Sequence, residues 1–166
     1  MSVGVLNFMI SLRSNKIGKI QNSIIVYTDG GSRGNPGPAA IGIYIESGPE
    51  KIRPPRFYSE YIGEATNNEA EYRAVIFALK KIKLLLGKAN ILKNKIEIRI
   101  DSELVVKQLN GEYKILEKDL QPLFLEICNL KIDFGEIDFV QIDRSLNKEA
   151  DKMVNQELDK QKAKLF

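Results

Sequence analysis

The chain of 166 residues is long enough for one domain with a substantial core, and its composition is that of an ordinary globular protein, 43% hydrophobic and 28% charged. A net charge of +3 permits a nucleic-acid partner without requiring one, and no apolar run approaches the roughly 18 residues of a membrane span. The chain has no histidine and a single cysteine, Cys128, which excludes histidine bases, histidine metal ligands and an internal disulfide, and favours a reducing cytoplasm.

Residues 1–22 differ in character from the rest of the chain. An apolar start is followed by a polar, basic stretch over residues 13–21. The apolar part lacks both a basic beginning and a small-residue cleavage site, so it is a poor secretory signal. We interpret residues 1–22 as an N-terminal extension of unknown role, and we expect one folded domain over residues 23–166.

The first half of this domain is expected to be a three-stranded antiparallel meander. Residues 23–28 form a continuous β-branched and aromatic run, which predicts a strand buried on both faces. Residues 29–38 are rich in glycine and proline and are interpreted as a tight loop. Two further strands are predicted over residues 40–46 and 57–62.

Helices and strands alternate in the second half. Thr66 to Asn68 offer an N-cap for a helix over residues 69–86, and the alternation of residues 95–100 predicts a strand. The remaining predicted elements are a short helix from residue 101 to 109, a helix over 120–130, a strand over 138–142, and a helix that Asn147 caps and that runs to about residue 160. The order β-β-β-α-β-α-α-β-α implies an α/β fold with a mixed five-stranded sheet and helices on its faces.

Four carboxylates stand where apolar side chains are expected. Asp29 and Asp101 each end an apolar strand, whereas Glu71 and Asp151 lie on the packing faces of their helices. Burial of an ionised carboxylate is costly unless something neutralises it, and each acid alone could pair with a basic side chain or cap a helix. Four together, without histidine and without a matching set of core-facing basic residues, favour hard divalent cations such as Mg²⁺, which suit phosphoryl chemistry.

Four segments resemble, in order, the motif blocks of the ribonuclease HI family. They are YTDGGSRGNPGPAAIG (27–42), TNNEAEYRAV (66–75), IDSELVVKQLNG (100–111) and NKEAD (147–151), and the resemblance covers roughly residues 23–160. It implies an RNase H-like fold and a metal-dependent endoribonuclease that hydrolyses the RNA strand of RNA–DNA hybrids, leaving 5′-phosphate and 3′-hydroxyl ends.

The resemblance also implies a role for each acid. Asp29 would bridge two Mg²⁺ ions and share with Asp151 the ion that activates the attacking water. Glu71 and Asp101 would hold the second ion, which stabilises the leaving 3′ oxygen, and Glu71 could also reach the ribose 2′-hydroxyl. Mn²⁺ is an alternative to Mg²⁺ as the cofactor.

The loops are expected to recognise the substrate. The candidate binding residues are Gly30, Ser32, Asn35, Thr66, Asn67, Asn68 and Arg144. By resemblance, Ser32 and Asn35 contact the RNA strand in the minor groove. Thr66 and Asn67 would hold a DNA phosphate with the help of free N–H groups at a helix start, and Asn68 matches a further contact. Glycine at position 30 would let the backbone approach the substrate, and the asparagines could equally serve turns and caps.

The chain departs from bacterial members of the family around its last aspartate. Those members carry a flexible-loop histidine whose nearest analogue here is Arg144, so the chain resembles the histidine-free archaeal branch. A guanidinium can bind phosphate but cannot act as a base near neutral pH. Lys148 stands where many relatives have a glutamate that modulates metal binding, and the roles of Lys148 and Glu149 stay open. The acids in residues 111–122 outnumber the two lysines, so the basic helix that grips hybrid in bacterial members is expected to be absent.

Two alternative functions remain open. One is a non-cleaving RNase H-like module that binds nucleic acid, although such proteins usually lose a carboxylate. The other is a DNA-acting nuclease of the same fold, which usually has further DNA-binding domains. The expected partner is an RNA–DNA hybrid, with double-stranded RNA left open as a second substrate. No membrane association and no obligate protein partner are expected.

Overall fold

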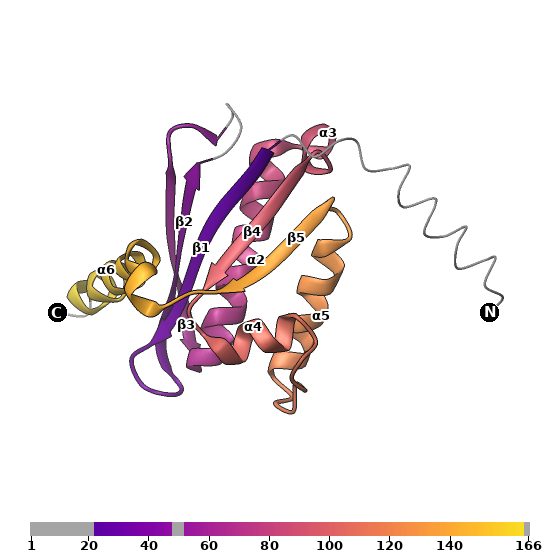
Figure 1. The fold of residues 1–166 in the computed structure, drawn as a ribbon. Coiled ribbons are helices and arrows are strands. Elements are labelled where there is room, and N and C mark those ends of the chain that lie inside the picture. The colour runs from indigo at the N-terminus through magenta and orange to yellow at the C-terminus, as the bar shows by residue number, and fades with distance from the viewer. Residues whose placement is uncertain (1–21, 48–51, 165–166) are drawn as a thin grey trace.

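The computed structural model describes residues 22–47 and 52–164 (Figure 1). Apart from Asn22, the predicted extension at residues 1–22 lies outside the described residues. No helix in the described ranges is long and apolar enough to cross a membrane.

Five strands form one mixed sheet in the order β3-β2-β1-β4-β5 (Figure 1). The strands are β1 (Asn22–Ser32), β2 (Gly37–Ser47), β3 (Arg56–Ala65), β4 (Asn94–Ile100) and β5 (Glu136–Gln141). The first three pair antiparallel, whereas β4 is parallel to both β1 and β5. The structure therefore confirms the predicted mixed sheet and its meander.

Helices cover both faces of the sheet. They are α2 (Asn67–Leu86), α3 (Lys88–Ile91), α4 (Glu103–Leu109), α5 (Leu120–Lys131) and α6 (Lys148–Lys164), with a 3₁₀ turn η2 (Arg144–Leu146) before the last. Gly30 faces the backbone of α2 and Gly31 faces Val154 of α6. Because successive strand residues point to opposite faces, α2 and α6 lie on opposite sides of β1. Neither α3 nor η2 was predicted.

The main core lies between the sheet and α2. The predicted alternation in β4 is confirmed, since Ile96, Ile98 and Ile100 are buried there beside Ile24 and Val26 of β1. The segment between α4 and α5 contains no helix in the described structure, which agrees with the expected absence of a basic protruding helix.

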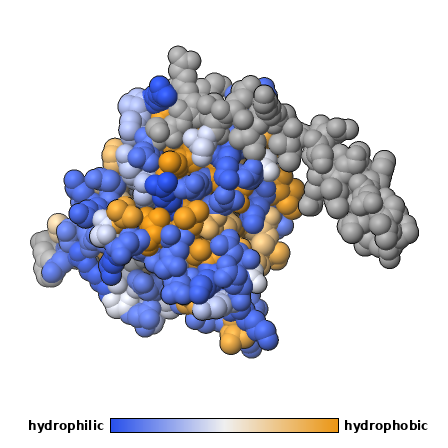
Figure 2. All heavy atoms as spheres, in the orientation of Figure 1, coloured by the Kyte–Doolittle hydropathy of each residue, from blue (hydrophilic) through white to orange (hydrophobic). Residues whose placement is uncertain are grey.

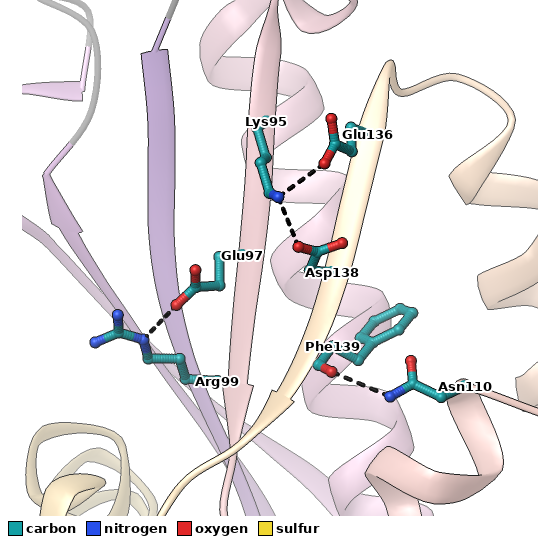
Figure 3. A network of polar contacts seen from close by, with 7 residues as sticks. All are labelled: Lys95, Glu97, Arg99, Asn110, Glu136, Asp138 and Phe139. Carbon is teal, nitrogen blue, oxygen red and sulfur yellow. Dashed lines mark hydrogen bonds and ion pairs between the residues drawn. The ribbon is translucent and has the colours of Figure 1, made fainter. Parts of the chain in front are cut away.

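Part of the other sheet face is open to solvent and carries paired charges (Figure 3). Lys95 Nζ lies 2.7 Å from a carboxylate oxygen of Glu136 and 2.7 Å from one of Asp138, and Arg99 Nε lies 2.7 Å from Glu97 Oε1. On the face seen in Figure 2, which has the orientation of Figure 1, most described residues are hydrophilic, and hydrophobic residues gather near its middle.

The first strand is longer than predicted, and the tight loop expected over residues 29–38 is wrong for most of its length. β1 continues to Ser32 and β2 begins at Gly37, so the turn shrinks to residues 33–36. Asp29 pairs across the strands with Gly42. Two of the glycines that suggested a loop, Gly30 and Gly31, instead face α2 and α6, whereas Gly34 lies in the short turn itself.

Candidate active site

Three of the four singled-out carboxylates meet where the pairing between β1 and β4 ends. Asp29, Glu71 and Asp101 each offer one oxygen, and these oxygens all lie within 4.8 Å of one another. The parallel register pairs Tyr27 of β1 with Arg99 of β4, so the aspartates two residues further along each strand become neighbours. Glu71 reaches them from the first turns of α2.

Asp151 approaches the same place from the opposite face of the sheet. It lines one cavity of about 400 Å³ together with Asp29, Glu71 and Asp101. The side chain of Asp151 is 39% exposed, whereas Asp29 and Glu71 are buried. The sequence analysis directed all four acids toward buried surface, which the structure shows for only two of them.

The buried acids are electrostatically unfavourable without a cation. Burial, followed by the charges of Asp101 and Asp151, raises the pKa of Asp29 to about 7. Burial and the neighbouring Asp29 and Asp101 raise the pKa of Glu71 well above its usual value. The backbone N–H of Gly30 and the guanidinium of Arg144 oppose both shifts without cancelling them. Glu71 Oε2 is buried and has no hydrogen-bond partner among the described residues. An all-oxygen donor set of this kind fits a hard divalent cation.

Two glycines set the distances between the sheet and the helices that carry the acids. A Cβ on Gly30 would lie 2.1 Å from the backbone carbon of Ala70, so only glycine lets α2 bring Glu71 next to Asp29. A Cβ on Gly42 would lie 2.2 Å from the carbonyl oxygen of Ala150, the residue before Asp151. Glycine at position 30 is therefore required by the approach of α2, a reason that the sequence did not reveal, and its predicted contact with substrate stays a prediction. Sequence reasoning missed Gly42.

Three polar residues that border the site also escaped the sequence analysis in their observed roles. Asn147, predicted as a helix cap, is buried and donates its side-chain amide to the carbonyl of Thr28 at 3.0 Å. Asn155 donates to Oδ2 of Asp151 at 3.2 Å, and its spacing of four residues from Asp151 on a helix could have revealed it. Ser102 caps α4 by accepting from the N–H of Val105.

The expected RNA-contacting and DNA-contacting residues are joined to each other. The backbone N–H of Ser32 donates to Asn67 Oδ1 at 3.3 Å, and the backbone N–H of Asn67 donates to Asn35 Oδ1 at 3.0 Å. Ser32 and Asn67 line the cavity together with Gly30 and Arg144. The asparagine oxygens therefore organise the loops, as the alternative interpretation held, whatever their amide groups bind.

Most of the backbone N–H groups at the start of α2 already donate hydrogen bonds within the protein. Thr66 and Glu69 form a reciprocal capping box, with Thr66 N–H donating to Glu69 Oε2 and Glu69 N–H to Thr66 Oγ1. The N–H of Asn67 is also used, so the expectation of free N–H groups is wrong at these three positions. The side-chain amide of Asn68 lies 3.5 Å from Glu117 Oε2. Thr66, Asn68 and Asn35 are not part of the cavity wall.

Arg144 supplies an exposed positive charge at the cavity wall. Its side chain is 83% exposed, and Nη2 lies 3.8 Å from Asp151 Oδ1. A weak, solvent-exposed ion pair of this kind contributes little to stability, so the guanidinium can exchange its partner for a phosphate at small cost.

Comparison with known proteins agrees with this geometry. The family model described as RNase H matches residues 21–161. Ribonuclease HI of Halobacterium salinarum is 39% identical over 133 residues, which are 80% of this chain and 63% of that protein, slightly less than two thirds.

Solved structures give the same result. LC11-RNase H1 in complex with RNA/DNA hybrid is 44% identical with a TM-score of 0.75, covering 82% of this chain and 97% of that one. RNase H1 from Halobacterium salinarum NRC-1 is 35% identical with a TM-score of 0.73, covering 83% and 98%. On this evidence the chain belongs to the RNase H family, and within it to the ribonuclease HI group.

Proposed function

We propose that this chain is an endoribonuclease that hydrolyses the RNA strand of RNA–DNA hybrids. The observation that carries the proposal is the meeting of Asp29, Glu71 and Asp101 within 4.8 Å on the wall of a cavity that Asp151 also lines. Membership of the RNase H family and the likeness to an RNase H1 bound to RNA/DNA hybrid support this substrate.

Divalent cations, Mg²⁺ with Mn²⁺ as an alternative, are the proposed cofactors. Asp29, Glu71 and Asp101 would hold one ion, and Asp29 with Asp151 a second. When bound, such ions supply charge stabilisation at the scissile phosphate and raise the acidity of water. The unpartnered Glu71 Oε2 and the raised pKa values of Asp29 and Glu71 support a cation here, because a nearby positive charge would relieve both.

The reaction adds water across a phosphodiester bond of the RNA strand. A water oxygen bonds to phosphorus while the bond to the 3′ oxygen breaks, which leaves a 5′-phosphate and a 3′-hydroxyl. The protein's own task is to hold the phosphate and the four carboxylates in one geometry, and such positioning accounts for much of enzymatic phosphoryl transfer.

Substrate binding is proposed for the residues around the cavity mouth. Gly30 and Ser32 lie on the cavity wall, and Asn35 is linked to Ser32 through Asn67, which supports the proposal that these residues contact the RNA strand. Thr66, Asn67 and Asn68 at the start of α2 are proposed to face the DNA strand. Arg144, on the rim beside Asp151, is proposed to attract a phosphate.

The limits of the catalytic domain are proposed as residues 23–166, and a cytoplasmic location is proposed from the cysteine content. Cys128 is half-buried and makes no disulfide, as a chain with one cysteine requires. A reducing compartment is the usual home of such proteins.

The alternatives are a non-cleaving module and a DNA-acting nuclease, and one assay separates all three functions. End-labelled RNA–DNA hybrid, duplex RNA and duplex DNA are each incubated with Mg²⁺, Mn²⁺ or EDTA. We expect cleavage of the hybrid's RNA strand with either metal and none with EDTA. Binding without cleavage would favour the module, and cleavage of duplex DNA would favour the DNA nuclease. The duplex RNA arm decides whether this is a second substrate.

A further inference from the structure

Asn147 is a buried polar residue that the proposed reaction does not use. None of its surface is exposed, and its Nδ2 donates 3.0 Å to the backbone carbonyl of Thr28. Its Oδ1 is buried without a hydrogen-bond partner among the described residues. The single side-chain hydrogen bond of Asn147 therefore joins the segment before α6 to the central strand β1.

This hydrogen bond lies on a short path between two of the acids. Thr28 directly precedes Asp29, and the backbone carbonyl of Asn147 accepts from the N–H of Asp151 at 3.1 Å. Two successive hydrogen bonds thus connect the backbone beside Asp29 to the backbone of Asp151. The path is buried at its centre, where water does not compete for the donors and acceptors.

Other contacts of α6 constrain it in different directions. Gly42, which pairs with Asp29 across β1 and β2, lets the carbonyl of Ala150 approach closely and so fixes the height of the helix above the sheet. Van der Waals packing of this kind resists approach more than sliding along the strands. The ion pair of Arg144 with Asp151 is long and exposed, so it adds little restraint. Two polar contacts join the later turns of α6 to β3 and to the β1–β2 turn: Ser59 Oγ lies 3.4 Å from Glu157 Oε2, and the exposed Arg33 pairs with Asp159. The bond from Asn147 to Thr28 is the fully buried directional contact, and it acts at the start of α6, next to Asp151.

We propose that Asn147 is a positioning residue that holds Asp151 beside Asp29 and thereby sets the metal affinity of the pair. The inference rests on the proposed function, since it assigns a metal to these two carboxylates. Removal of a group that orients a metal ligand typically weakens metal affinity or activity about 10-fold to 100-fold.

Asn147→Ala is the test, and Asn110→Ala is its matched control. Asn110, at the end of α4, donates its side-chain amide to the carbonyl of Phe139 at 3.2 Å (Figure 3). Both variants therefore cut one bond between an asparagine amide and a strand carbonyl, but only Asn147 is connected to the acids. The measurements are KM and kcat for hybrid, the Mn²⁺ concentration at half-maximal rate, and amide hydrogen exchange of the metal-free protein at Asp151.

For Asn147→Ala we expect KM to stay within about threefold, while kcat falls and the Mn²⁺ midpoint rises by about 10-fold or more. Exchange at the Asp151 amide should accelerate by at least about 10-fold, because its acceptor residue is no longer held. Asn110→Ala should leave the Mn²⁺ midpoint and the Asp151 amide unchanged.

A wild-type Mn²⁺ midpoint in Asn147→Ala, unchanged exchange at Asp151, or equal effects in the control would each overturn the proposal. If Asn147→Ala does not fold, Asn147→Ser, whose side chain is too short to reach Thr28, undergoes the same measurements. If the wild-type protein cuts no hybrid, the proposed function fails, whereas the exchange experiment still decides whether Asn147 holds the start of α6.

Discussion

Asp29→Asn is expected to stabilise the metal-free protein while abolishing cleavage. Burial and the charges of Asp101 and Asp151 raise the pKa of Asp29 from 3.8 to about 7. An acid whose pKa rises on folding binds its proton more tightly in the native state. Its contribution to stability is therefore fully present below about pH 4 and is lost as the pH rises to about 7.

The magnitude follows from the size of this shift. A rise in the pKa of Asp29 from 3.8 to about 7 corresponds to about 4 kcal/mol of native-state destabilisation at pH 8. Each unit by which the pKa differs between the folded and unfolded states is about 1.4 kcal/mol. Asparagine removes the charge and keeps an oxygen that can accept from Gly30, but it adds a buried amide that costs about 1–3 kcal/mol when unpaired. We expect a net gain of about 2 kcal/mol, or about 4–8 °C in Tm for a domain of this size.

Thermal melts of both proteins between pH 4 and pH 8, with EDTA and with Mg²⁺, check the prediction. The gain should be smallest at pH 4, grow to about pH 7 and stay constant above it. Mg²⁺ should narrow the gap, because it binds and stabilises only the wild type. Asp138→Asn is the control, since it removes a carboxylate paired with Lys95 on the open face and should not raise Tm.

The reasoning is refuted if the gain does not depend on pH, or if Asp29→Asn is the less stable protein at pH 8. Retention of more than about a tenth of wild-type cleavage, about 1.4 kcal/mol in the barrier, would contradict the proposed role of Asp29.

Three further predictions concern α6, the rim and the extension. Gly42→Ala should lower the free energy of unfolding in urea by about 1–3 kcal/mol, because the added Cβ would overlap the carbonyl of Ala150. The cleavage rate should fall as well, and an unchanged kcat would contradict the close approach of α6 to Gly42. Arg144→Ala should raise KM for hybrid in steady-state assays without removing any rate step with a pKa of about 6–7, since a guanidinium does not titrate there; loss of such a step would overturn the phosphate role. A variant starting at Gln21 should keep its Tm and turnover number and show a raised KM only at low salt; a large drop in Tm would show that the extension is not dispensable.

The fold was largely predictable because its signals are local. The alternation of β4 and the capping residues at Thr66 each reflect interactions within a few residues, and both are confirmed. The glycines after Asp29 misled the prediction, because glycine in a strand resembles glycine in a turn until the neighbouring helix is known. The length of β1 was therefore underestimated.

The candidate site likewise has a part that the sequence predicted and a part that it could not. The four carboxylates could be singled out because each contradicts the polarity expected at its own position. The hydrogen bond from Asn147 to Thr28 and the approach of Ala150 to Gly42 could not be predicted, since they join segments more than a hundred residues apart. Asn147 and Gly42 also have ordinary local explanations in the sequence, such as a helix cap or a turn.

The division of the acids between the beginning and the end of the fold has a consequence during synthesis. Asp29, Glu71 and Asp101 lie in β1, in α2 and directly after β4, whereas Asp151 lies in α6, the last element that the structure describes. A ribosome-bound nascent chain can assemble the first three acids while α6 is still inside the exit tunnel, but it lacks the fourth. Nuclease activity should therefore begin only after α6 has emerged and docked on the sheet, because Asp151 joins the other three acids at that point.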